Sequence, residues 1–135
     1  MDNFEHLRRA QTVLLSTRRR DGRTVQTPVN LAIDRDGTGY FRTWSTAGKA
    51  KRLANFPGLR LAPCSMTGRA QGSDQPALAS RLSGPEADHA SRLLAEQFPV
   101  LHGLIVPWLH RLQHRHTIYF RLVPAAEPTP WQGVE

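Results

Sequence analysis

Two Asp-Gly dipeptides constrain the fold of this chain more than any other feature of its sequence: Asp21-Gly22 and Asp36-Gly37. An Asp-Gly pair between β-rich segments is the strongest short-range signal for a β-hairpin, because glycine readily adopts the positive φ that tight turns need. The β-rich runs that flank the two turns are residues 12–17, 25–33 and 40–44. The sequence therefore predicts an antiparallel meander of three strands at its start.

The second of these runs, residues 25–33, contains Pro28. Proline cannot donate to a sheet, so this stretch must lie at an edge, at a bulge or at a bend. Bulges are often found beside active sites. Further short strands are predicted at residues 59–64, 66–71, 78–83 and 117–122. Short strands at this spacing, with turn signals between them, predict a small barrel.

Three helical segments are expected around the strands. Asp2 caps a short first helix that ends near Gln11, and residues 85–98 form a second with proline in its first turn. Residues 99–112 form a third helical run with a broad apolar face that could meet a partner subunit. Its apolar residues are Leu101, Leu104, Ile105, Trp108 and Leu109. The predicted class is mainly β with peripheral helices (α+β).

Residues 45–52 break a local rule of helix design. A polar turn leads to Gly48, which opens a short helix whose first residues include Lys49, Lys51 and Arg52. Cations are unfavourable at the positive end of a helix, and a bound phosphate would resolve the conflict. Helical spacing places Lys49 and Arg52 on one flank and directs Lys51 to the far side. A solvated basic helix remains the alternative.

The length and composition of the chain limit its number of domains and the kinds of molecule that it can bind. The 135 residues suit one domain, residues 1–123, followed by a proline-rich tail, residues 124–135. Eighteen Lys and Arg against eleven Asp and Glu give a net charge of +7, which indicates a nucleic acid, a membrane surface or a phosphorylated small molecule. Arginines 18–20 are interpreted as a solvated hairpin tip, since no aromatic residues are interleaved with them.

The cellular compartment is predicted from what the sequence lacks. A single cysteine excludes an internal disulfide framework, and no apolar window is long enough for a membrane span. The first residues also lack the apolar core of a signal peptide. We expect a cytoplasmic protein.

No catalytic residue and no metal site are predicted. His110 and His114 have the i,i+4 spacing of a helical metal pair, but neither a third ligand nor a HExxH glutamate accompanies them. Cys64 lies at the end of an apolar strand and is predicted to fill the core. The sequence has no GxSxG, Walker A or GxGxxG motif. An enzymatic function would therefore depend on a cofactor.

The run YFRTWSTAGKAKRLANFPGLRLAPC, preceded by TPVNLAI and DGTGYF, resembles the FMN-binding-like split β-barrel oxidoreductases related to pyridoxamine 5'-phosphate oxidase. The resemblance extends over about residues 14–122 and is greater to the branch that uses the deazaflavin coenzyme F-420 (8-hydroxy-5-deazaflavin). It implies a homodimer with the cofactor between subunits. It also implies hydride transfer between the reduced coenzyme and a small organic acceptor.

The same resemblance implies two groups of cofactor-binding residues. The first lies where the coenzyme phosphate is held and comprises Thr43, Ser45, Gly48, Lys49, Lys51 and Arg52. The second lies where a strand backbone runs along the isoalloxazine-type ring and comprises Thr27, Pro28, Val29 and Asn30.

The chain departs from the family pattern at the ring. The Asn30 position is often a bulky aromatic in the deazaflavin branch, so the small amide opens the ring pocket. FMN-dependent members use a strand arginine in this region, where this chain has Gln26 and Asn30. FMN is the alternative cofactor. A non-catalytic module that binds nucleic acid or another phosphorylated ligand is the alternative of a different class.

Overall fold

The computed structural model describes residues 4–10, 12–19, 21–44, 53, 58–65, 67–98 and 117–125, with residue 44 described by its backbone. A short 3-10 helix, η1 (Glu5–Leu7), precedes the sheet, and α2 (Gly84–Gln97) precedes its last strand. The strands are β1 (Thr12–Arg18), β2 (Thr24–Asn30), β3 (Ala32–Ile33), β4 (Gly39–Trp44), β5 (Gly58–Pro63), β6 (Gln75–Arg81) and β7 (Thr117–Pro124). The predicted mainly β, α+β class is confirmed.

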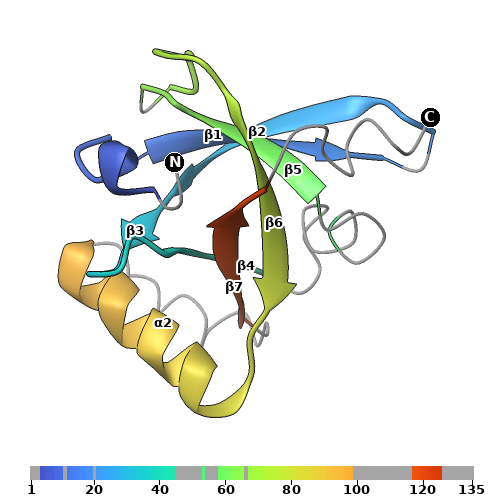
Figure 1. Cartoon of the computed structure of the whole chain (residues 1–135). Coiled ribbons are helices and arrows are strands. Elements are labelled where there is room, and N and C mark those ends of the chain that lie inside the picture. Colours follow the sequence, from blue (N-terminus) through green and yellow to red (C-terminus); the bar gives the residue numbers. More distant parts are fainter. Residues whose placement is uncertain are drawn as a thin grey trace.

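The seven strands form one sheet in the order β2-β1-β5-β6-β7-β4-β3, and neighbouring strands pair antiparallel. Its two end strands, β2 and β3, are separated in the chain by Leu31 alone. The sheet is therefore curled, with both edges supplied by one stretch of chain. Figure 1 shows β1, β2 and β5 crossing over β4 and β7, and α2 lying beside β3.

The inner face of the curled sheet holds the main core. Phe41 and Phe120 stack there with ring centroids 5.2 Å apart, and Phe4 and Leu31 close one end. Gly39 permits this packing, because a Cβ at that position would lie 3.1 Å from Leu31 Cδ1. Each fully buried large apolar side chain contributes about 1.5–3 kcal/mol relative to exposure. The core residues also include Val13, Leu15, Ile33, Leu53, Leu59, Leu61, Ile118 and Leu122.

Helix α2 covers part of the outer face. Ala90 packs with Tyr40 and Leu82 in a second apolar cluster, which Ala87 and Leu93 border. The helix begins as predicted, with Pro85 in its first turn, and its apolar residues face the sheet. At its last turn, the Gln97 side-chain amide reaches β3 and bonds to the backbone of Ile33. Within the described ranges, no helix is long and apolar enough to cross a membrane.

Three turns share one geometry. In each, the first residue accepts a bond from the glycine three positions on and donates to the residue after that glycine. The glycines Gly22, Gly37 and Gly68 have φ values of 89°, 85° and 92°. This is a type I turn followed by a glycine bulge. The hairpins at Asp21-Gly22 and Asp36-Gly37 are confirmed.

Several predicted elements are corrected. Residues 25–33 do not form one strand: the chain bends at Leu31, and β2 pairs with β1 while β3 pairs with β4. Both hairpins of the expected meander form, but they lie at opposite ends of the sheet instead of side by side. The strand predicted at residues 66–71 is wrong for the described residues 67–71, because the hydrogen bonds of the third glycine turn join Ser65 to Gly68 and Arg69 and leave a single bridge between Cys64 and Ala70.

Three smaller differences follow from packing. The first helix is only the 3-10 turn η1, since Phe4 and Leu7 enter the core from a short segment. Strand β6 begins at Gln75 rather than at residue 78, because its first residues pair with β5. Arg18 is 9% exposed at the end of β1 and does not belong to a solvated tip.

Candidate functional site

Strand β2 is an edge of the sheet, as its proline predicts. The Arg19 N–H donates to the Arg23 carbonyl at 2.8 Å, which fixes the alternation of hydrogen-bonded pairs along this hairpin. By that alternation, Thr27 and Val29 direct their backbone groups toward Leu15 and Val13. The intervening residues of β2 direct theirs away from the sheet.

The outward backbone groups belong to Gln26, Pro28 and Asn30. Gln26 and Asn30 each contribute an N–H and a C=O group. Pro28 contributes only its carbonyl, because proline has no N–H. Within the described ranges, these groups make no hydrogen bond. The edge therefore offers, in one plane, the donors and acceptors that a flat heterocycle with N–H and C=O groups in its ring plane can match.

The side chains of β2 divide between two faces, because successive residues of a strand point to opposite sides. Thr27 and Val29 pair with core residues of β1 and point inward, and Val29 packs against the core. Gln26, Pro28 and Asn30 lie on the outer face, where Gln26 and Pro28 are exposed and Asn30 is half-buried. Of the predicted ring residues, Pro28 and Asn30 thus present both backbone and side chain to the candidate site.

Two side-chain amides on this outer face are held in opposite orientations: one turns its oxygen outward and the other its nitrogen. Gln26 Nε2 donates to Ser16 Oγ at 3.3 Å, which leaves the amide oxygen outward. Thr12 Oγ1 donates to Asn30 Oδ1 at 3.4 Å, which leaves the amide nitrogen outward. The sequence analysis missed Thr12 and Ser16. The sequence TVLLSTR of β1 does not alternate polar and apolar residues, so the place of Thr12 and Ser16 follows only from the register with β2.

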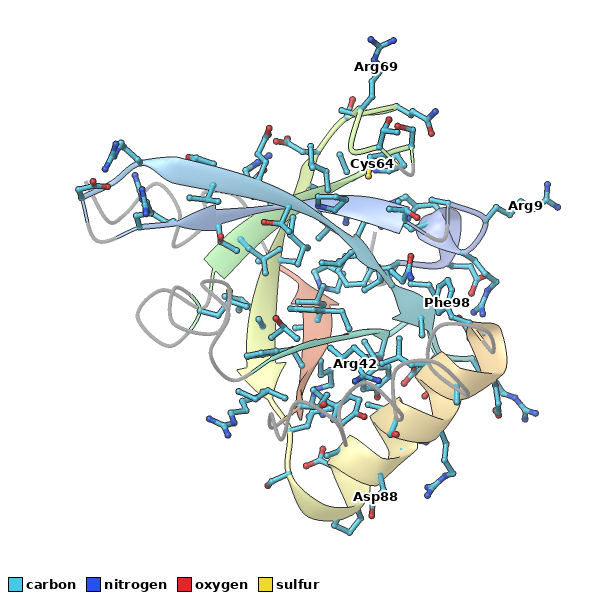
Figure 2. All side chains as sticks on the ribbon, turned by 180° about the vertical axis from the view of Figure 1, so that it is seen from behind. Arg9, Arg42, Cys64, Arg69, Asp88 and Phe98 are labelled. Atoms are coloured by element: carbon cyan, nitrogen blue, oxygen red, sulfur yellow. The ribbon has the colours of Figure 1, made fainter. Side chains whose placement is uncertain are left out.

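The third glycine turn lies against the same part of β2. A Cβ at Gly68 would lie 3.7 Å from Pro28 Cγ, so this turn and the exposed proline are neighbours. Figure 2 shows Cys64 and Arg69 at this end of the molecule, with Arg69 pointing outward. Burial raises the pKa of the Cys64 thiol, which keeps it protonated at neutral pH and unsuited to act as a nucleophile.

The predicted phosphate residues are only partly placed. Thr43 lies on β4, is 8% exposed and pairs with core residue Ile118, so its side chain points into the sheet interior. Ser45, Gly48, Lys49, Lys51 and Arg52 lie outside the described residues. The phosphate half of the site stays a prediction.

One further cation lies away from β2. Arg42 sits between the sheet and α2 (Figure 2), where its Nη2 donates to Thr117 Oγ1 at 3.2 Å. Its guanidinium carbon lies 5.8 Å from the centre of the Tyr119 ring, and burial lowers its pKa. This arginine contacts β7, which is not adjacent to β2 in the sheet.

In the ranges that the structure describes, no three His, Cys, Asp or Glu side chains gather as metal ligands. The predicted pair His110 and His114 falls outside those ranges.

Solved structures share this fold. HutZ, the haem storage protein from Vibrio cholerae, is 20% identical, with a TM-score of 0.69 over 92% of both chains. An F420-H2 dependent reductase, FDR-A, is 15% identical, with a TM-score of 0.59 over 83% of this chain and 93% of its own. A Listeria innocua protein provisionally described as a pyridoxamine 5'-phosphate oxidase is 14% identical, with a TM-score of 0.59 over 86% and 85%.

No protein-family model and no curated protein matches the chain. The structural likeness shows the fold: the chain is a split barrel of the kind that pyridoxamine phosphate oxidase-like proteins share. Proteins with this fold include both oxidoreductases and a haem storage protein.

Proposed function

We propose that the protein is a homodimeric oxidoreductase that binds coenzyme F-420 along the β2 edge and transfers a hydride between it and a small organic acceptor. The observation that carries this proposal is the outward row of backbone N–H and C=O groups at Gln26, Pro28 and Asn30. A deazaflavin ring carries complementary groups in its own plane, and the bound coenzyme supplies the hydride chemistry.

Charge supports an anionic coenzyme. The net charge of +7 attracts a phosphorylated ligand, and the proposed phosphate contacts are Lys49 and Arg52, with Ser45. Thr43 is left out of this group because its buried side chain points into the sheet interior. FMN is the alternative coenzyme. It is the less favoured of the two because β2 carries Gln26 and Asn30 where the FMN-dependent enzymes carry an arginine.

The proposal includes the assembly and the compartment. A second subunit would cover the β2 edge and complete the site, and the apolar residues predicted between 101 and 112 supply a surface for that contact. The single cysteine, which is buried, suits the reducing cytoplasm.

Haem binding is a second candidate, favoured by the TM-score of 0.69 to HutZ. Haem iron usually takes a histidine ligand. The two histidines of the described residues are already engaged, His6 with Gln75 and His89 with Asp34. For the described part of the chain the haem proposal is therefore the weaker one; His102, His110, His114 and His116 lie outside it.

Parallel titrations separate the candidates. Purified protein is titrated with reduced F-420, oxidised F-420, FMN, haemin and a random DNA duplex, and binding is followed by fluorescence and visible absorption. We expect micromolar binding of F-420, weaker binding of FMN and no Soret shift with haemin. Duplex binding that falls steeply with salt, without F-420 binding, would instead indicate a non-catalytic nucleic-acid module.

A matched pair of lysines tests the phosphate half. A hydrogen bond to a charged group contributes roughly 1.5–3 kcal/mol, so Lys49→Ala should weaken F-420 binding by about tenfold to a hundredfold. Lys51→Ala, on the far side of the predicted helix, should have a smaller effect. Equal losses in the two variants, both shrinking with added salt, would show a diffuse basic surface instead of a phosphate site.

A further inference from the structure

We propose that Asn30, oriented by Thr12, is the residue that recognises the hydride acceptor, and that this acceptor carries a carbonyl oxygen. The inference rests on the proposed function and assigns the substrate side of the same site. Thr12 acts as a positioning residue, because it touches Asn30 and not the ligand.

The plane of the sheet determines the side on which the acceptor binds. Backbone hydrogen bonds at a strand edge lie near the plane of the sheet. A flat ring held by the outward groups of Gln26, Pro28 and Asn30 therefore continues that plane, with one face on each side. The inner side belongs to Thr27 and Val29, whose side chains border the core. We place the acceptor on the outer side, where Gln26 and Pro28 are exposed and Asn30 is half-buried.

The outer side is where the Asn30 amide lies. Thr12 Oγ1 donates to Asn30 Oδ1, so the amide oxygen is occupied and the Nδ2 group, with its two N–H donors, is left for a ligand. Within the described ranges, Nδ2 has no partner. An acceptor stacked on the outer face of the ring therefore meets a donor at this end of β2.

Gln26 shows the opposite arrangement four residues earlier, about 13 Å along the strand. Its Nε2 donates to Ser16 Oγ, so an acceptor oxygen faces outward there. The two amides thus make the ends of β2 chemically different, and only the Asn30 end offers side-chain N–H donors to a carbonyl.

The chemistry requires such a donor. When a carbonyl-bearing acceptor receives a hydride at a conjugated carbon, negative charge develops on its oxygen. Pre-oriented N–H groups stabilise that charge. In the balanced reaction the acceptor gains a hydride, with its electron pair, and one proton from water, while the reduced coenzyme would supply the hydride, lose two electrons and release one proton to water.

Asn30→Asp tests the role of the donors. Aspartate keeps an oxygen for Thr12 but replaces the N–H groups with a charge that repels a developing oxyanion. With menadione, a quinone, as the acceptor probe, we expect kcat to fall by about tenfold to a hundredfold. The affinity for oxidised F-420 should change by less than about twofold. A cationic tetrazolium salt, which has no carbonyl oxygen, should be reduced at the wild-type rate.

A Thr12 pair tests the positioning. Thr12→Val removes the hydroxyl with little change of shape and should lower kcat for menadione several-fold, whereas Thr12→Ser keeps a donor and should restore it. Thr24→Val is the matched control, because Thr24 is exposed on the same face of β2 and lies outside the coenzyme-binding row; it should leave the menadione kcat unchanged. None of these substitutions should alter the melting temperature of the coenzyme-free protein by more than that of Thr24→Val.

A binding measurement without turnover completes the test. In protein labelled with ¹⁵N, the Asn30 side-chain amide signals should shift when menadione is added to the complex with oxidised F-420. Unchanged signals, or equal losses of menadione and tetrazolium reduction in Asn30→Asp, would overturn the assignment while leaving the proposed coenzyme in place. A wild-type protein that does not bind F-420 would overturn both proposals.

Discussion

The two edges of the sheet, β2 and β3, come from one stretch of chain but are treated in opposite ways. At β3 the Ile33 N–H donates to Gln97 Oε1 at 3.1 Å, and Gln97 Nε2 donates back to the Ile33 carbonyl at 2.9 Å. The side-chain amide thus replaces a neighbouring strand. At β2, the outward backbone groups make no such bonds within the described residues.

Arginine strengthens the closure of the β3 edge. Arg8 donates to the carbonyls of Ile33 and Asp34 at 2.8 and 2.7 Å, and Glu5 holds its guanidinium with contacts of 2.6 and 2.7 Å. Edge strands invite unwanted pairing, and proteins normally block them. The comparison indicates that β3 is blocked within the subunit, while β2 is left for a ligand or a second subunit.

The largest expected effect separates the two sides of β2 itself. Thr27→Pro removes an N–H that pairs with β1 and leaves the buried Leu15 carbonyl without a hydrogen-bond donor. The free energy of unfolding should therefore fall by roughly 3 kcal/mol. Gln26→Pro removes an N–H that points away from the sheet. It should cost much less stability and abolish F-420 binding.

Urea unfolding and coenzyme titration of both variants check this prediction. If Gln26→Pro destabilised the protein as much as Thr27→Pro, the Gln26 N–H would be part of the fold, and the edge would not be available to a ligand.

A smaller effect is expected from opening the β3 edge. Gln97→Leu leaves the Ile33 N–H without its partner and should lower the free energy of unfolding by about 1–2 kcal/mol. The Ile33 amide should also exchange its hydrogen faster. Gln97→Glu keeps an acceptor for that N–H and serves as the control with a milder loss. Exchange that is equally slow in both variants would show that Gln97 does not close this edge.

The smallest effect concerns the ion pair that ties α2 to the turn after β3. His89 Nε2 lies 2.7 Å from Asp34 Oδ2, and this hydrogen bond is the main cause that lowers the Asp34 pKa below its ordinary value of 3.8. Burial opposes the shift, and the Arg35 N–H adds to it. Tyr40 packs its ring against the imidazole.

Since the folded-state pKa of Asp34 is the lower one, the pair stabilises the protein above about pH 4–5, and that stabilisation is lost as the pH falls through the folded-state pKa. His89 is 46% exposed, so the contribution should be only about 0.2–1 kcal/mol. Unfolding free energies of the wild type and Asp34→Asn, measured between about pH 3 and pH 6, should converge at the acid end. A constant difference would contradict the assignment.

Local chemistry made part of the fold predictable. Asp21-Gly22 and Asp36-Gly37 predicted their hairpins because the turn geometry depends on one glycine. Pro28 limited its stretch to an edge, a bulge or a bend because proline lacks a donor. Gly68 forms the same turn without a preceding Asp or Asn, so its β-rich surroundings gave the wrong prediction of a strand. The bend at Leu31 depends on which strands pair, and that is decided by distant parts of the chain.

The site was predictable to a lesser degree for the same reason. The resemblance indicated residues 27–30, but the face on which each side chain lies follows from the register with β1. That register also introduces Thr12 and Ser16, which no motif marks. Gln97 and Ile33, whose hydrogen bonds close the β3 edge, are 64 positions apart in the chain, so no local pattern in the sequence marks this contact.

The pairing of β4 with β7 has a consequence for synthesis. Arg42 and Thr117, which meet across these strands, are 75 residues apart, so Phe41 cannot reach Phe120 until most of the chain has left the ribosome. At about 5–20 residues per second, β4 spends several seconds paired with β3 at most and without β7, its partner on the other side. During that interval η1, which is synthesised before β4, is available to cover the aromatic side chains of the core. We expect nascent chains that end before residue 117 to depend on chaperones, and slow long-range closure to limit refolding.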